Sequence, residues 1–144
     1  MWSSFIIHKR ILKFFPVIIF LLLSGYLYSQ EITGLTSLQF YEQYGDRLNE
    51  DSLLIIDGRT DSMFAGGHIG KSVNIDADAD NLEKQLYQHL DQPTIVIYCT
   101  TTRRTTDIVN KLRGIYKGNI IWITDGIRGW KQNGLPVNNS RVSP

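Results

Sequence analysis

The chain contains a single cysteine, Cys99, among its 144 residues. One cysteine excludes an intrachain disulfide and a cysteine-based zinc site within one chain. The three histidines, His8, His68 and His89, have no spacing typical of metal ligands, so we expect no metal and no other cofactor. The formal net charge of +1 provides no strong basic field, which argues against nucleic acid as a partner.

Acidic residues are absent from residues 1–29. Lys9, Arg10 and Lys13 precede an uninterrupted apolar run at residues 14–23, and small residues follow it. A basic flank, an apolar stretch and then small residues are the order of a secretory signal peptide. The sequence therefore predicts that residues 1–29 are a signal peptide.

Cleavage after Ser29 would leave a protein that is periplasmic or secreted. The alternative is an uncleaved anchor in the inner membrane formed by residues 11–28, which nearly reach the length of about 20 residues that a membrane-spanning helix needs. We favour cleavage because of the short apolar run and its flanks. A membrane is expected as a partner only if this segment is retained.

Residues 30–137 alternate between short apolar runs and segments with helical periodicity, which indicates one domain followed by a C-terminal tail at 138–144. The expected strands are residues 53–56, 72–75, 94–98 and 119–123. The expected helices are residues 36–44, 81–90, 105–113 and 126–133. Strands that are apolar on both faces are covered on both sides. The sequence thus predicts an α/β fold with an open parallel sheet and helices on both faces.

Polar residues follow three of these predicted strands, at residues 57–59, 99–105 and 124–126. In an open parallel sheet the carboxyl ends of the strands form the ligand-binding edge, so these segments are expected to meet there. Cys99 is central among them, and two arginines and a predicted helix start follow it. Nearby cations and a helix N-terminus lower the pKa of a cysteine below its free value of about 8.5. This arrangement predicts a reactive thiolate at Cys99.

Four segments of the chain resemble signatures of the rhodanese family, and they occur in the family's order. They are Leu-Ile-Ile-Asp-Gly-Arg at 54–59, Phe-Ala-Gly-Gly-His-Ile-Gly-Lys-Ser-Val-Asn-Ile at 64–75, Ile-Val-Ile-Tyr-Cys at 95–99, and Thr-Asp-Gly-Ile-Arg-Gly-Trp-Lys-Gln-Asn-Gly-Leu-Pro-Val at 124–137. Each signature alone is weak, but four in order are specific. The resemblance spans about residues 35–137 and implies a rhodanese-like fold.

The resemblance also implies a sulfurtransferase. In such a cycle Cys99 takes a sulfane sulfur from thiosulfate or a similar small anionic donor, holds it as a persulfide, and passes it to a thiol or cyanide. A thioredoxin-like protein is among the expected acceptors.

The family's Cys-x-x-Gly-x-Arg-Ser pattern assigns positions in the active loop, with Arg104 at the arginine and Thr105 at the serine. The residues expected to surround the sulfur and bind the donor are Thr100, Thr101, Thr102, Arg103, Arg104 and Thr105. Asp57 and Arg59 are expected to support this loop as an ion pair or cap.

Thr102 stands where the family pattern has a glycine. Glycine readily adopts a positive φ, whereas a β-branched residue with positive φ is an outlier. Either the loop uses different backbone angles here or its activity is altered. The second case leaves open a non-catalytic rhodanese-fold module that binds an anion or a partner.

Three other readings of the site are weaker. Cysteine phosphatases of related fold place arginine after five intervening residues, a spacing that reaches Thr105 and misses Arg104 by one position. A cysteine–histidine hydrolase would need His68, which the family pattern assigns to a structural turn. Redox sensing within the chain would need a second cysteine to resolve an oxidised Cys99.

Overall fold

The computed structural model describes residues 30–100 and 102–139, which contain one five-stranded sheet in the order β1-β5-β4-β2-β3. The strands are β1 (Ile32–Leu35), β2 (Leu54–Asp57), β3 (Val73–Asn74), β4 (Thr94–Tyr98) and β5 (Asn119–Ile123). Every pairing between them is parallel. The open parallel sheet predicted from the sequence is confirmed, and β4 is its central strand.

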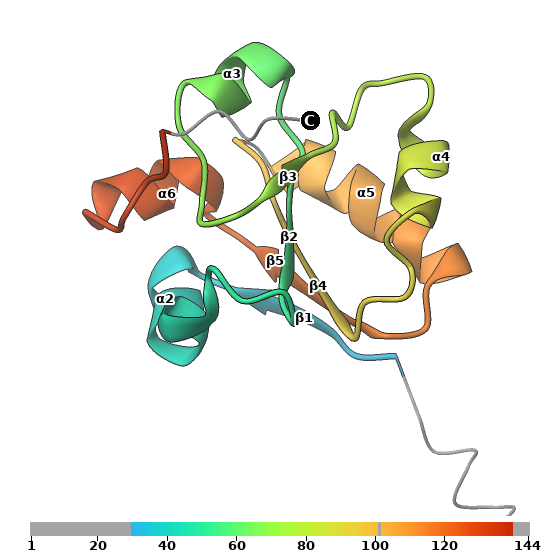
Figure 1. Cartoon of the computed structure of the whole chain (residues 1–144), viewed down its shortest axis with the longest axis horizontal. Helices are drawn as coiled ribbons and strands as arrows, with labels where there is room; N and C mark the ends of the chain where they lie inside the picture. The colour runs from blue at the N-terminus through green and yellow to red at the C-terminus, as the bar shows by residue number, and fades with distance from the viewer. Residues whose placement is uncertain (1–29, 101, 140–144) are drawn as a thin grey trace, which may run out of the picture.

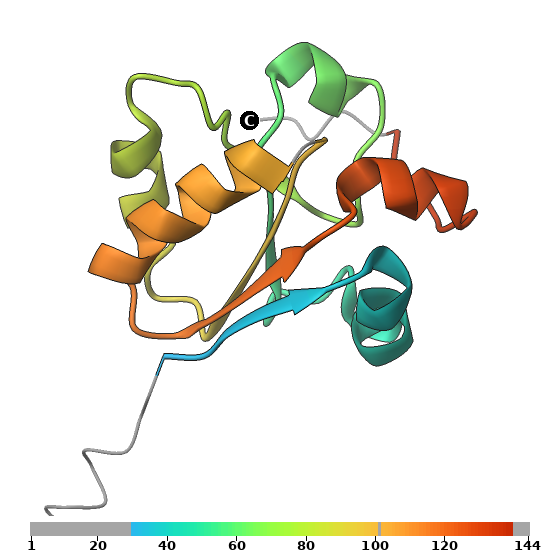
Figure 2. The same ribbon diagram turned by 180° about the vertical axis from the view of Figure 1, so that it is seen from behind.

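Helices cover both faces of this sheet, as expected (Figures 1 and 2). They are α2 (Ser37–Tyr44), the short 3-10 helix η1 (Gly45–Arg47), α3 (Asp61–Ala65), α4 (Leu82–Tyr87), α5 (Thr102–Ile115) and α6 (Gly126–Gln132). Helices α2 and α6 pack together on one face, and α4 and α5 pack on the other. The short α3 lies beyond the carboxyl end of β2.

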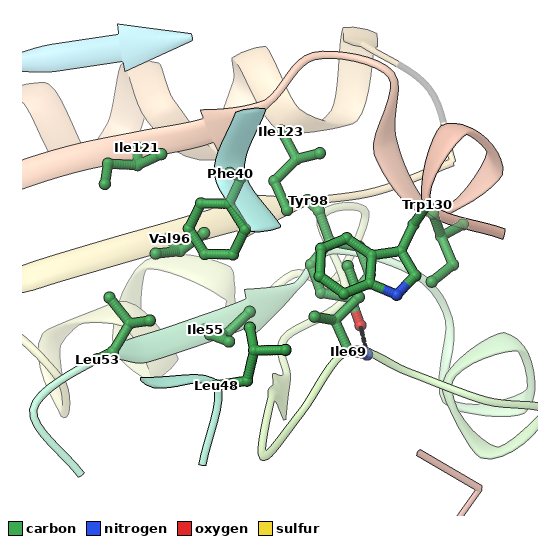
Figure 3. Packing of buried hydrophobic residues seen from close by; sticks show 11 residues of the cluster. Phe40, Leu48, Leu53, Ile55, Ile69, Val96, Tyr98, Ile121, Ile123 and Trp130 are labelled. Carbon is green, nitrogen blue, oxygen red and sulfur yellow. Dashed lines mark hydrogen bonds between the residues drawn. The ribbon is translucent and has the colours of Figure 1, made fainter. Parts of the chain in front are cut away.

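The two faces are built by simple alternation along the strands. In β4, Val96 and Tyr98 point into the core under α2 and α6, whereas Ile95 and Ile97 point into the core under α4 and α5. Figure 3 shows the first core, in which Trp130 of α6 packs near the strand residues. Successive side chains of a strand point to opposite faces of the sheet, so a strand that is buried on both faces needs apolar residues at every position.

The start of α5 differs from the sequence-based expectation. The helix begins at Thr102, whereas apolar periodicity pointed to residue 105. The first turn is made of polar residues that carry no apolar pattern, so it resembles a loop in the sequence. Consequently only residues 100 and 101 separate Cys99 from the helix.

Three elements have no counterpart among the expectations. Strand β1 contains Gly34 and is a short edge strand, α3 is only five residues long, and η1 has three residues. All three are too short to produce a clear periodic signal. Strand β1 completes the sheet by pairing Ile32 to Leu35 with residues 120–123 of β5.

Asn138 belongs to the folded domain and not to a free tail. Its N–H donates to the carbonyl oxygen of His68 at 2.8 Å, and the N–H of His68 donates back at 2.9 Å. The side-chain amide of Asn138 also donates to the carbonyl oxygen of Gly70 at 3.0 Å. These bonds fix the chain at Asn138, one residue beyond the predicted end of the domain at residue 137.

The predicted signal peptide falls on residues 1–29, which lie outside the described residues. None of the helices in the described part of the chain combines the length and apolar character of a membrane span.

Candidate active site

Cys99 follows β4 directly, at the carboxyl edge of the sheet, and its side chain is fully buried. Its thiol donates to the carbonyl oxygen of Gly58 across a sulfur–oxygen distance of 3.6 Å. The N–H of Gly58 in turn donates to the carbonyl oxygen of Tyr98 at 2.8 Å. The segment after β2 therefore lies directly against the thiol. The sequence predicts a reactive thiolate at Cys99, and the structure places this thiol in a fully buried position.

Gly58 also explains how α5 approaches this edge. A Cβ atom at Gly58 would lie 2.8 Å from Cδ1 of Ile108 and 3.7 Å from Cβ of Cys99. The missing side chain leaves room for Ile108, which packs α5 onto the sheet.

The start of α6 holds the backbone of Cys99 from the other side. The N–H of Ile127 donates to the carbonyl oxygen of Cys99 at 3.0 Å. Gly126 has a φ of +57°, and a Cβ atom there would lie 2.1 Å from that carbonyl oxygen. Only glycine allows this approach. The three polar strand ends thus meet around Cys99, as the sheet topology predicted.

Asp125 anchors the same turn to α2. Its carboxylate accepts the backbone N–H and the hydroxyl of Ser37, each at 2.7 Å. Asn133 donates to the Ser37 hydroxyl oxygen at 3.0 Å, so both ends of α6 are tied to the start of α2. This polar cluster fixes the turn that carries Gly126.

Asp57 and Arg59 form the ion pair expected from the sequence, and both side chains are buried. The Nε of Arg59 donates to both carboxylate oxygens of Asp57, at 2.9 and 3.0 Å. The Nη2 of Arg59 also donates to the carbonyl oxygen of Gly67 at 2.7 Å. Tyr98 donates its hydroxyl to the same carboxylate. The pair therefore ties β2 to the 67–72 turn and to the residue before Cys99.

Burial and the neighbouring Asp57 raise the pKa of Tyr98 well above its ordinary value, so its phenol remains a donor. Burial alone would lower the pKa of Arg59, but its hydrogen bonds and the charge of Asp57 outweigh burial and raise it. Both groups therefore keep a single protonation state. They form structural support and are not acid–base groups.

Of the loop residues expected to contact sulfur, Thr100 is half-buried, whereas Thr102 is exposed as the first residue of α5. Thr101 lies outside the described residues. Positive φ values among the described residues occur only at glycines, so Thr102 does not adopt the glycine-favouring region. Thr105 is buried one helical turn into α5. Thr102 therefore has a backbone conformation open to any residue, which removes the strain considered for this position.

The two arginines are engaged by aspartates. Arg104 Nη2 lies 2.8 Å from Oδ2 of Asp78, and Arg103 Nη2 lies 3.6 Å from Oδ1 of the same carboxylate. Arg103 also contacts Asp107, one turn along α5, at 3.2 Å. Sequence reasoning missed Asp78, although the alternating aspartates at residues 76, 78 and 80 are an unusual pattern.

His68 is a buried packing residue. Its ring stacks on Phe64 with centroids 4.0 Å apart, and its Nδ1 lies 3.3 Å from the carbonyl oxygen of Phe64. The thiol of Cys99 has Gly58 as its partner and not this imidazole. Within residues 30–100 and 102–139, no cluster of three acidic, histidine or cysteine side chains could hold a metal ion.

Comparison with known proteins agrees with this geometry. A family model described as rhodanese-like domain matches residues 41–133, which include Cys99, the Asp57–Arg59 pair and α6. The chain belongs to the rhodanese-like family. A relative, an uncharacterized protein of Synechocystis sp., is 30% identical over 95 residues, covering 66% of this chain and 52% of that protein. The chain thus spans about half the length of this relative.

Solved structures show the same fold. A rhodanese-related protein of Thermoplasma volcanium has a TM-score of 0.61 at 22% identity, covering 75% of this chain and 99% of that one. A structure titled thiosulfate sulfurtransferase, from Pseudomonas aeruginosa, has a TM-score of 0.61 at 14% identity, covering 76% of this chain and 21% of that one. A rhodanese-like domain protein of Staphylococcus aureus has a TM-score of 0.57 at 20% identity, covering 74% and 98%. At these identities the likeness concerns the rhodanese fold alone.

Proposed function

We propose that this protein is a sulfurtransferase in which Cys99 carries a sulfane sulfur as a persulfide. The observation that carries the proposal is the place of Cys99, at the end of the central strand and three residues before the start of α5. Membership of the rhodanese-like family supports the same role, and one protein of similar fold is titled a thiosulfate sulfurtransferase.

The first half of the cycle is a displacement at sulfur. The Cys99 thiolate attacks the outer sulfur of thiosulfate, a new sulfur–sulfur bond forms, and sulfite leaves with the electron pair of the broken bond. In the second half, an acceptor thiolate or cyanide attacks the outer sulfur of the persulfide, and the Cys99 thiolate leaves. No external oxidant or reductant is consumed.

The start of α5 suits the persulfide chemically. A helix of 14 residues has N–H groups in its first turn that lack helical carbonyl partners. These groups and the helix dipole favour negative charge beside the N-terminus. A persulfide on Cys99 would present its charged outer sulfur near this turn, while the strand and α6 hold the residue in place.

Burial of the thiol sets a requirement for transfer. The sulfur must leave its contact with the Gly58 carbonyl oxygen before a donor reaches it. This same burial favours the second candidate, a non-catalytic module that binds a partner through the rhodanese fold. The two candidates differ in one observable, the gain of a sulfur atom at Cys99.

The test is incubation of the folded protein with thiosulfate, and separately with cysteine persulfide, followed by intact mass measurement. We expect a gain of one sulfur atom that dithiothreitol removes and that the Cys99→Ser variant does not show. Folding of each sample is checked by circular dichroism. If neither donor adds sulfur to the folded protein, the sulfurtransferase proposal is overturned and the binding module is favoured.

The compartment and acceptor are part of the same proposal. The signal-peptide pattern of residues 1–29 supports a periplasmic or secreted enzyme, for which thiols, cyanide and thioredoxin-like proteins are the acceptors to test. Sequencing the N-terminus of the protein recovered from the periplasm checks cleavage. A protein that begins at Met1 would contradict cleavage.

A further inference from the structure

The segment at residues 76–80, Asp-Ala-Asp-Ala-Asp, lies against the site. The N–H of Ala77 donates at 3.2 Å to the carbonyl oxygen of Gly58, which also accepts the thiol of Cys99. The N–H of Asp78 donates to Oδ1 of Asp76 at 3.0 Å, which fixes the turn. Asp78 therefore directly follows Ala77, whose N–H donates to the same carbonyl oxygen as the thiol of Cys99.

Asp78 faces the arginines at the start of α5. Its two carboxylate oxygens contact Arg104 and Arg103, and Arg103 also contacts Asp107. Two arginines and two aspartates leave this group with no net charge. Arg104 is the less exposed of the two arginines, with 23% of its side chain exposed against 67% for Arg103. Arg104 is also the arginine that matches the family motif, and Asp78 forms the shorter contact with it.

We propose that Asp78 determines donor specificity. Its carboxylate engages Arg104 and disfavours dianionic donors such as thiosulfate, so that organic persulfides, R–S–SH, are the preferred source of sulfur. This inference rests on the sulfurtransferase role proposed above and names its substrate class. A dianion would have to displace Asp78 from Arg104 or bind beside a negative charge. At a separation of about 6 Å in a water-like dielectric, that repulsion weakens binding roughly tenfold.

An organic persulfide avoids this repulsion. The Cys99 thiolate attacks the outer sulfur of R–S–SH, the original sulfur–sulfur bond breaks, and R–S⁻ leaves with its electron pair. The proton first stays on the transferred sulfur, which gives Cys99–S–SH, and its loss to solvent then leaves the charged outer sulfur. In the protonated form that reacts, the donor is uncharged at its reacting end, so it does not need the Arg104 guanidinium.

Sulfate binding tests the electrostatic part of the inference, because sulfate is a tetrahedral dianion that holds no sulfane sulfur. The backbone amide signals of residues 102–105 are followed by NMR during a sulfate titration at low, constant ionic strength. We expect Asp78→Asn to bind sulfate about tenfold more tightly than the wild type. Asp78→Glu, which retains the charge, and Asp80→Asn, whose carboxylate has no ion-pair partner in the described residues, should both stay within about twofold of the wild type. Equal affinities in the wild type and Asp78→Asn would overturn the inference.

Donor preference is measured by the rates at which thiosulfate and cysteine persulfide load sulfur onto Cys99. The ratio of the thiosulfate rate to the persulfide rate should rise about tenfold in Asp78→Asn, and an unchanged ratio would also overturn the inference. Should neither donor load Cys99 while the sulfate affinities differ as expected, the proposed function fails and the electrostatic role of Asp78 stands. If Asp78→Asn loses its fold, Asp78→Ser replaces it in both measurements.

Discussion

The phenol of Tyr98 donates a 2.6 Å hydrogen bond to Oδ2 of Asp57, from the residue directly before Cys99. The same oxygen of Tyr98 accepts the N–H of Ile69 at 3.0 Å (Figure 3). It also lies 3.1 Å from the Ser72 hydroxyl. One phenol thus joins the central strand, β2 and the 67–72 turn beneath the site. Because this hydroxyl is buried, the loss of any of these hydrogen bonds leaves the partner group without a water molecule to replace it.

Replacing Tyr98 with Phe tests this junction. The ring still fills the core, but the Asp57 carboxylate loses a donor and the Ile69 N–H loses its acceptor. Leaving such buried groups unpaired costs about 1–3 kcal/mol. Urea unfolding measures the loss, with Tyr87→Phe as the control because the Tyr87 side chain is exposed. A variant with wild-type stability would show that water or a shifted neighbour satisfies both groups.

For the buried Asp57–Arg59 pair, we expect removal of the arginine alone to destabilise the protein more than removal of both charges. Arg59→Met leaves a buried carboxylate without its cation and should cost about 3–5 kcal/mol. The double variant Asp57→Asn/Arg59→Met removes both charges and should recover part of that loss. Arg47→Met is the matched surface control, since the exposed pair of Arg47 with Glu50 should be worth less than about 1 kcal/mol. If the double variant is no more stable than Arg59→Met, the unpaired charge is not the cause.

The sequence predicts best where burial alone decides the structure. Strands β4 and β5 were expected at residues 94–98 and 119–123 and are observed with those bounds. A short, continuously apolar run is typical of a strand that is buried on both faces of a parallel sheet. The helix expected at residues 36–44 is α2, and Thr36 caps it: the Thr36 hydroxyl accepts the N–H of Gln39, and the Gln39 side chain accepts the N–H of Thr36.

The site was harder to predict because it depends on contacts between distant segments. The motifs identified Cys99 and its neighbouring strand ends, and the topology brings those ends together. The pairing of Asp78 with Arg104 has no local signature, since it requires residues 76–80 to fold back onto the sheet edge. The early start of α5 was missed because its first turn is polar on every side.

Gly126 provides a further test, because its missing side chain allows α6 to approach Cys99. Gly126→Ala would place a methyl group 2.1 Å from the Cys99 carbonyl oxygen at a φ of +57°, so we expect a loss of more than about 1 kcal/mol. Gly134→Ala separates the effect of the positive φ from the effect of the steric contact, since Gly134 has a φ of +66° but open space around it. Gly114→Ala, within α5 and also in open space, should instead stabilise the protein by up to about 1 kcal/mol. Thermal or urea unfolding ranks the three variants. Equal losses for Gly126→Ala and Gly134→Ala would show that contact with the Cys99 carbonyl is unimportant.

Thr102 gives the last prediction. The family pattern has glycine at this position, but Thr102 is the first residue of α5 and lies outside the positive-φ region. Its carbonyl oxygen accepts the Thr106 hydroxyl at 2.9 Å, a bond that a change of the Thr102 side chain leaves intact. Thr102→Gly should therefore cost less than about 0.5 kcal/mol through helix propensity. Sulfur loading of Cys99 should stay within about twofold of the wild type.

Thr102→Ala is the matched control, because it removes the hydroxyl and the β-branch without adding glycine's backbone freedom. Intact mass over a time course measures loading for all three proteins. A gain of tenfold or more in Thr102→Gly alone would mean that the loop needs a conformation that threonine resists. Equal gains in both variants would instead assign the effect to the threonine side chain, which is exposed beside the site.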